Sequence, residues 1–205
     1  MVSDNERLKV VGVGGTLREG SSSLGALRRA LSAAEEAGAE AELLNLRDLG
    51  LPMYEPGRPL GDYGPEVRRF IEALRGADAL ILSTAAYHGT LAGVTKNALD
   101  FTQFLKRDER PYLEGRVVGL ISTAGGDRAA ANTTDSMVHV VHALRGDVAP
   151  QMVTIRGAWS RFDGEGNVTD EGFGRRLERL GELVVSMAEG LNRSQRGRDA
   201  VGVAL

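Results

Sequence analysis

The sequence of 205 residues contains no cysteine, which excludes disulfide bonds, thiolate metal sites and cysteine nucleophiles. It also lacks any apolar stretch close to the roughly 20 residues that a membrane-spanning helix needs. The first residues, MVSDNERLK, lack the apolar core of a signal peptide. The net charge is only −3 and no dense basic run precedes the C-terminal residues, so nucleic acid is not the expected partner. We therefore expect a soluble, cytoplasmic protein.

What the sequence does contain is a regular alternation of apolar runs and amphipathic segments. Buried strands are expected at residues 8–14, 39–46, 78–83, 116–123 and 148–155, and helices at 21–38, 65–75, about 92–105, 128–145 and 171–191. Strands that alternate with helices in this way predict a three-layer α/β sandwich around a five-stranded parallel sheet. We expect a single domain over residues 1–191 and a mobile tail over residues 192–205.

The loop after the first strand, Gly14–Ser23, is rich in groups that bind anions. Its sequence GGTLREGSSS supplies the hydroxyl of Thr16, the guanidinium of Arg18 and three serines. The N–H groups at the start of the following helix also favour an anion, so the loop suits a phosphate monoester. A glycine turn followed by ordinary N-capping serines would give the same pattern.

Two later loops, each following a predicted strand, suit a flat ligand. In the loop Thr84–Gly93, backbone N–H groups could hydrogen-bond a heteroaromatic ring beside Tyr87 or His88. The loop Ser122–Arg128 has two adjacent glycines, which allow the backbone to approach a ligand closely. Taken alone, each of these two loops is more often a plain connection than a ligand site. Ligands of parallel sheets bind beyond the carboxyl ends of the strands, where all three loops would lie.

Competing sites do not fit the sequence. A dinucleotide G-x-G-x-x-G motif would need glycine in place of Leu17, and no Gly-Lys-Ser/Thr follows the first loop. His139 and His142 are spaced to share one helix face but have no convincing third ligand, so no metal site is expected.

The second loop carries the specific signal. Tyr87-His88-Gly89-Thr90, with Gly93, Lys96-Asn97 and Leu99-Asp100, resembles the Pro-x-Tyr-His-Gly-Thr-x-Ser-Gly-x-x-Lys-Asn-x-Leu-Asp signature of NAD(P)H-dependent FMN reductases. The first loop resembles that family's Gly-Ser-x-Arg-x-x-Ser phosphate loop, and the third resembles its glycine-rich loop over the flavin ring. Thr16, Ala85 and Ala92 stand where the family usually has serine, proline and serine.

The resemblance implies a flavodoxin-like sandwich with strand order 2-1-3-4-5 and one FMN site shared by the three loops. The residues expected at the phosphate are Thr16, Arg18, Ser21, Ser22, Ser23 and Leu24. Those expected at the ring and ribityl chain are Ala86, Tyr87, His88, Gly89 and Thr90. Those expected to close over the ring are Ser122, Thr123, Gly125 and Gly126.

The activity that the resemblance implies is hydride transfer from NADPH or NADH to the flavin, and on to free FMN, a quinone or another small-molecule acceptor. A partner monooxygenase would be a second kind of recipient for reduced flavin. No essential acid–base residue is expected, because this chemistry belongs to the cofactor. The family also implies a homodimer or a dimer of dimers, with the Lys96–Asp100 helix at the interface. A flavodoxin-type electron carrier and a non-catalytic FMN-binding domain are the alternatives.

Overall fold

The structure is a computed structural model that describes residues 7–201. Its strands are β1 (Lys9–Gly14), β2 (Glu40–Asn45), β3 (Ala79–Tyr87), β4 (Thr90–Leu91), β5 (Val117–Thr123), β6 (Asp147–Val148) and β7 (Val153–Ile155). Its α-helices are α1 (Ser22–Glu36), α2 (Leu46–Leu49), α3 (Pro65–Arg75), α4 (Gly93–Asp100), α5 (Asp127–Ala143) and α6 (Glu171–Val201). Short 3₁₀ helices lie at Leu60–Asp62, Phe101–Leu105 and Ala158–Ser160.

The sheet has the predicted topology. Its strands follow the order β2-β1-β3-β5-β6, with β7 also paired to β5, and all of these pairs are parallel. β6 and β7 are two pieces of the expected fifth strand, so the predicted order 2-1-3-4-5 is confirmed. The strand is interrupted near Pro150, which has no N–H to donate to the ladder.

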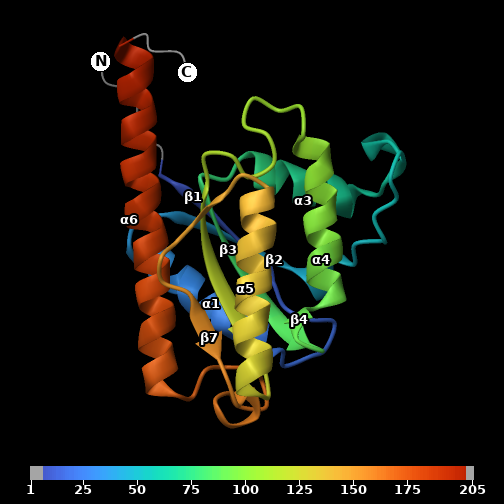
Figure 1. Ribbon diagram of the computed structural model, residues 1–205, viewed down its shortest axis with the longest axis vertical. Helices are drawn as coiled ribbons and strands as arrows, with labels where there is room; N and C mark the ends of the chain where they lie inside the picture. The colour runs from blue at the N-terminus through green and yellow to red at the C-terminus, as the bar shows by residue number, and fades with distance from the viewer. Residues whose placement is uncertain (1–6, 202–205) are drawn as a thin grey trace.

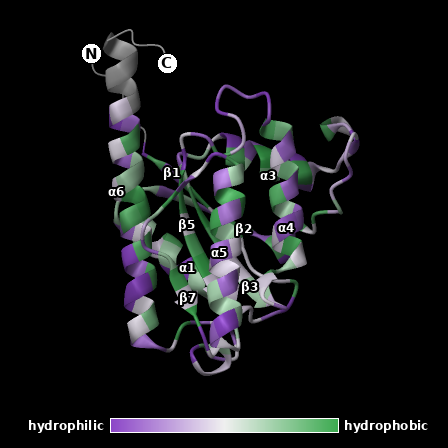
Figure 2. Cartoon of the chain, in the orientation of Figure 1, coloured by the Kyte–Doolittle hydropathy of each residue, from purple (hydrophilic) through white to green (hydrophobic). Residues whose placement is uncertain are grey.

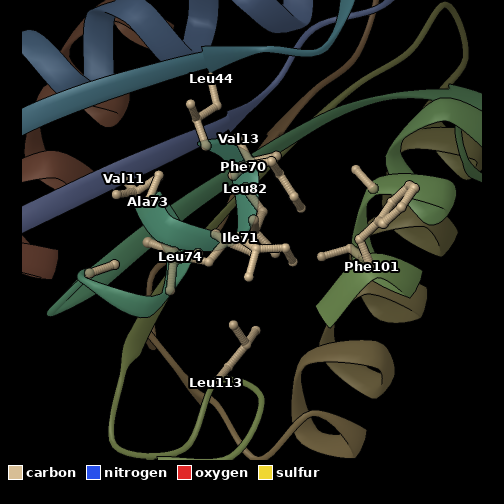
Figure 3. Close-up of a cluster of buried hydrophobic side chains, with 14 of the residues drawn as sticks. Val11, Val13, Leu44, Phe70, Ile71, Ala73, Leu74, Leu82, Phe101 and Leu113 are labelled. Atoms are coloured by element: carbon tan, nitrogen blue, oxygen red, sulfur yellow. The ribbon is translucent and has the colours of Figure 1, made fainter. Parts of the chain in front are cut away.

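Helices cover both faces of this sheet and create two separate cores (Figure 1). Val10 packs into the core beneath α1 and α6, whereas Val11 and Val13 pack into the core beneath α3, α4 and α5. This division follows from the strand geometry, in which successive side chains point to opposite faces. Both faces are therefore apolar, and the central strands β1, β3 and β5 are mostly hydrophobic, whereas the edge strand β2 carries Glu40 and Glu42 (Figure 2). Figure 3 shows the larger core, where Phe70 and Ile71 pack against the sheet.

Two predicted boundaries were wrong. β3 continues to Tyr87, and not Ser83, because the chain folds back and pairs Ala86 with Leu91 in β4. The last helix continues to Val201, and not Leu191, because the added residues contain no proline and several good helix formers. Residues 202–205 of the expected tail lie outside the described residues, and mobility of the tail stays a prediction. No helix in the described part of the chain combines the length and the apolar character needed to cross a membrane.

A buried arginine fixes the end of the sheet that lies opposite the three loops. The side chain of Arg116 donates hydrogen bonds to the carbonyl oxygens of Ala77 and Arg75, each at 3.0 Å. Arg116 is 2% exposed and forms no ion pair with any residue in the described part of the chain. Burial lowers the pKa of Arg116 to about 10, so the group stays protonated at neutral pH. The guanidinium therefore supplies donors to buried backbone carbonyls, of which that of Ala77 also accepts a longer bond, of 3.3 Å, from Arg110.

Replacement of this arginine should destabilise the fold. We expect Arg116→Met to lower the free energy of unfolding by about 2–3 kcal/mol, because buried carbonyl oxygens lose their donors. Urea denaturation followed by circular dichroism measures the loss. Arg107→Met is the matched control at an exposed arginine and should change stability by less than about 0.5 kcal/mol. Equal stabilities of the two variants would show that the buried hydrogen bonds contribute nothing.

Candidate functional site

The parallel pairing of β1, β3 and β5 brings the loops that follow these strands to one edge of the sheet, at the lower end of Figure 1. A pocket of about 210 Å³ opens there. Its lining comes from all three loops and from the segment after β7: Thr16, Arg18, Ser21, Ser22, Ser23, Ala85, Ala86, Tyr87, Thr123, Ala124, Gly125 and Ala158. Loops far apart in sequence thus form one site.

One end of the pocket is suited to an anion. Helix α1 begins at Ser22, and the side chain of its N-cap residue Ser21 makes no capping hydrogen bond to the backbone of the helix. The hydroxyl of Ser21 instead lies 3.0 Å from that of Ser23. The first N–H groups of α1 therefore have no capping side chain, and they carry the positive end of the helix dipole. Their position in the pocket wall favours a negatively charged ligand.

Arg18 adds a positive charge to this end. Its guanidinium makes one long hydrogen bond, from Nη2 to the carbonyl oxygen of Gly20 at 3.4 Å. Arg18 forms no ion pair with any carboxylate in the part of the chain that the structure describes. The neighbouring Arg47, by contrast, pairs with Glu19 at 2.6 Å, and the hydrogen bond from Arg47 lowers the pKa of Glu19. Arg18 is therefore available to a ligand.

The segment 163–167 packs against the loop that follows β1 and against the first turn of α1. A Cβ at Gly25 would lie 1.6 Å from the carbonyl oxygen of Gly166, and one at Gly20 would lie 2.6 Å from that of Gly164. Only glycine allows two backbones to approach this closely. The segment 163–167 thus sets the position of the first turn of α1.

Asp163 keeps that supporting loop in shape. Its carboxylate accepts hydrogen bonds from Asn167 Nδ2 at 3.0 Å and from the backbone N–H groups of Asn167 and Glu165, at 2.8 and 3.0 Å. The bonds from Asn167 are the main reason that the pKa of Asp163 lies below its usual value. The carboxylate is therefore ionised at neutral pH, the form in which it accepts these bonds.

The second predicted loop is a tight hairpin between β3 and β4. His88 and Gly89 both have positive φ, at 52° and 85°, as a two-residue type I′ turn requires. The Thr84 hydroxyl accepts a bond from the Ala92 N–H at 3.1 Å and anchors the hairpin at the start of α4. Tyr87 is 54% exposed and lines the pocket. His88, Gly89 and Thr90 do not line it, because they form the turn beyond it.

The third loop is attached to the segment after β7. The Ala158 N–H donates to the Ala124 carbonyl at 3.0 Å, and the Gly157 N–H donates to the Gly125 carbonyl at 3.3 Å. A Cβ at Gly125 would lie 2.6 Å from Cζ3 of Trp159. A side chain at this position would therefore meet the exposed indole ring of Trp159, which lies against the third loop.

The pocket includes most of the residues predicted to bind FMN. Ser122 is an exception, because its buried hydroxyl lies 2.7 Å from that of Thr134 and donates to the Ala130 carbonyl. The remaining predicted residues outside the lining are Leu24, His88, Gly89, Thr90 and Gly126. The lining residues that the sequence did not indicate are Ala85, Ala124 and Ala158, whose side chains carry no polar group. Direct contact of any of these residues with FMN stays a prediction.

The donor set fits a phosphorylated flat ligand such as FMN. Hydroxyls, a guanidinium and an uncapped helix N-terminus meet at one end of the pocket, and an aromatic side chain and a glycine backbone meet at the other. A model of the NADPH-dependent FMN reductase family matches residues 8–160. The chain belongs to this family. The family predicted from the sequence is thus confirmed, and so is the class of protein, an NAD(P)H-dependent, FMN-binding oxidoreductase.

Similar proteins agree with this assignment. An NAD(P)H-dependent FMN reductase of Pseudomonas aeruginosa is 31% identical over 172 residues, which cover 82% of this chain and 88% of that protein. A probable NADPH:quinone oxidoreductase of Oryza sativa subsp. japonica is 26% identical, with 80% of each chain covered. The solved structure of an NADH:FMN oxidoreductase has the same fold, with a TM-score of 0.67 at 15% identity, and covers 88% of this chain and 89% of its own.

The contact between Gly25 and Gly166 can be tested directly. In Gly25→Ala the new methyl group must displace the 163–167 segment, so we expect unfolding of the apoprotein to become about 1–3 kcal/mol easier and FMN to bind more weakly. Urea denaturation and FMN titration measure the two effects. Gly190→Ala is the control in α6, where a Cβ meets nothing within 4 Å, and should stabilise the helix by up to about 1 kcal/mol. A Gly25→Ala protein as stable as the original would contradict this packing.

Proposed function

We propose that the enzyme holds FMN in the pocket formed by the three loops and uses NAD(P)H to reduce a small-molecule acceptor there. For a quinone acceptor, NAD(P)H gives up a hydride, which carries two electrons and one proton. A second proton comes from solvent, and the products are NAD(P)⁺ and the hydroquinone. The observation that carries the proposal is the meeting of Arg18, the uncapped start of α1, Tyr87 and Gly125 in one pocket.

The residues of the first loop are proposed to hold the phosphate. Arg18 supplies a charge-assisted hydrogen bond, and Thr16 and Ser22 supply hydroxyl donors. The open N–H groups of α1 complete the anion site. Leu24 lies one residue beyond the lining and contributes only through the backbone of that first turn.

The second and third loops are proposed to position the flavin ring. Tyr87 and the backbone of Ala86 form one wall, and Thr123 and Gly125 form the facing wall. His88, Gly89, Thr90, Ser122 and Gly126 act indirectly, by fixing the shape of these two loops. When bound, FMN would supply the redox chemistry. The chain itself supplies position and electrostatics, so no side chain is assigned as an acid or base.

The acceptor and the assembly are part of the proposal. A quinone or free FMN is the proposed acceptor, since relatives are named for these reactions. A partner monooxygenase is a further proposed recipient of reduced flavin. We also propose a homodimer or dimer of dimers in the cytoplasm, where NAD(P)H is available. Lys96 pairs with Asp100 at 2.5 Å on the exposed face of α4, which is the face proposed for the dimer contact.

Anaerobic mixing of the FMN-loaded protein with NADPH or NADH tests the activity. Rapid loss of the visible flavin absorbance is expected with at least one nucleotide, and its return on addition of a quinone completes the cycle. A flavodoxin-type carrier would bind FMN but would not be bleached by either nucleotide. A protein that does not become yellow when FMN is added would be the non-catalytic alternative, a domain that binds FMN poorly.

The phosphate role of Arg18 has a directional test. We expect Arg18→Ala to weaken FMN binding by roughly 10- to 100-fold, because a charge-assisted hydrogen bond is lost, and to leave riboflavin binding within about twofold. Fluorescence titration of the apoprotein with each flavin measures both constants. Arg29→Ala is the control, since Arg29 lies on α1 but pairs with Glu178 of α6. Equal losses for FMN and riboflavin would refute the role.

A further inference from the structure

Trp159 is exposed beside the pocket without a structural reason for its exposure. Its side chain is 77% exposed, although its ring contacts Gly125 of the third loop. Its neighbour Ala158 lines the pocket, whereas Trp159 does not. The indole therefore lies at the mouth of the pocket and not inside it.

The backbone, and not the indole, holds this segment in place. Hydrogen bonds join Ala158 to Ala124 and Gly157 to Gly125. A side chain that is mostly exposed buries little apolar area, so the ring contributes little to folding. A large flat aromatic side chain kept in water at the opening of a ligand site is instead typical of a binding surface.

Tyr87 reaches the same opening from the opposite loop. It is 54% exposed and lines the pocket. Among residues 7–194, Tyr87 and Trp159 are the only aromatic side chains that are exposed. The two exposed Tyr and Trp rings of these residues therefore both lie at the rim of this pocket.

We infer that Trp159 is a specificity-determining residue, which stacks on the planar aromatic ring of the electron acceptor. The inference rests on the proposed function and names flat aromatic acceptors, of the quinone type, as the preferred class. Because Trp159 lies outside the pocket lining, the flavin phosphate loop and the ring walls do not need it. An acceptor that arrives over the mouth of the pocket meets the free face of the indole.

Steady-state kinetics on the FMN-loaded enzyme test the inference with two acceptors. Trp159→Ala should raise the KM for 1,4-naphthoquinone by roughly five- to tenfold, as expected for the loss of one aromatic stacking contact, whereas Trp159→Phe should stay within about twofold. The KM for ferricyanide, which has no aromatic ring, and the Kd for FMN should not change. Met53→Ala removes a side chain of similar exposure (73%) in another loop and serves as control.

A binding measurement gives a readout that does not depend on turnover. Trp159 is the only tryptophan of the sequence, so the indole fluorescence reports on this position alone. Anthraquinone-2-sulfonate added to the oxidised enzyme without nucleotide should quench this fluorescence and should bind Trp159→Ala more weakly, as followed by the change in flavin absorbance. Cyclohexanesulfonate, which is not planar, should do neither.

Three results would overturn the inference. They are an unchanged KM for naphthoquinone in Trp159→Ala, an equal rise for naphthoquinone and ferricyanide, and an effect confined to the KM for NADPH or the Kd for FMN. The last result would assign the indole to the nucleotide or the flavin. Failure of the proposed function looks different, because the original enzyme would then not be bleached by NADPH or NADH or would reduce neither acceptor.

Discussion

The site depends on the direct contact between β1 and β3. These strands are neighbours in the sheet although α1, β2, α2 and α3 separate them in the sequence, and the helices that follow β1 and β3 lie on opposite faces. A crevice forms at such a point beyond the strand ends. Here the contact is tight, because a Cβ at Gly14 would lie 2.4 Å from the carbonyl oxygen of Ser83. The Ser83 hydroxyl in turn donates to the Ser23 carbonyl at 2.7 Å and ties the start of α1 to the middle of β3.

Backbone contacts then connect the remaining parts of the site. The segment 163–167 meets the start of α1 at Gly25, and the residues after β7 are hydrogen-bonded to the loop after β5. These contacts involve main-chain atoms, which have few conformations once the strands are paired. The loops are therefore positioned by the sheet, even though they are irregular in themselves. The N–H groups at the start of α1 therefore point in a direction that the sheet determines, as the proposed anion site requires.

Much of this arrangement could be predicted from local sequence. The bounds of α3 were predicted correctly because Pro65 favours a first helical turn and Gly76 follows the last one. The central strands β1, β3 and β5 were found because both of their faces are buried, which produces apolar runs. The first-loop residues that line the pocket were singled out because hydroxyls and an arginine before a helix are typical of an anion site, and phosphate binding there stays a prediction. The extra length of β3 was missed because it depends on pairing with Leu91, a residue that on its own reads as part of a loop.

Long-range packing explains what the sequence could not reveal. Ser122 has the chemistry of a ligand-binding residue, yet Thr134 and Ala130 occupy its hydroxyl, and this pairing appears only when α5 packs beside β5. Ala158 lines the pocket through its position alone, so no residue type could have indicated it. The closeness of Gly25 and Gly166 joins residues from distant parts of the chain, and neither glycine is unusual in its local sequence.

The two ends of the pocket are built from different kinds of groups. The end suited to an anion uses backbone N–H groups and short hydroxyls, whose positions follow from the sheet. The mouth is formed by side chains, Tyr87 and Trp159, that contribute little to the core and can change without loss of the fold. In the proposed function, cofactor binding is thus tied to the architecture, whereas the proposed choice of acceptor depends on a few exposed residues. One fold can therefore keep a common flavin site while its reactions with acceptors diverge.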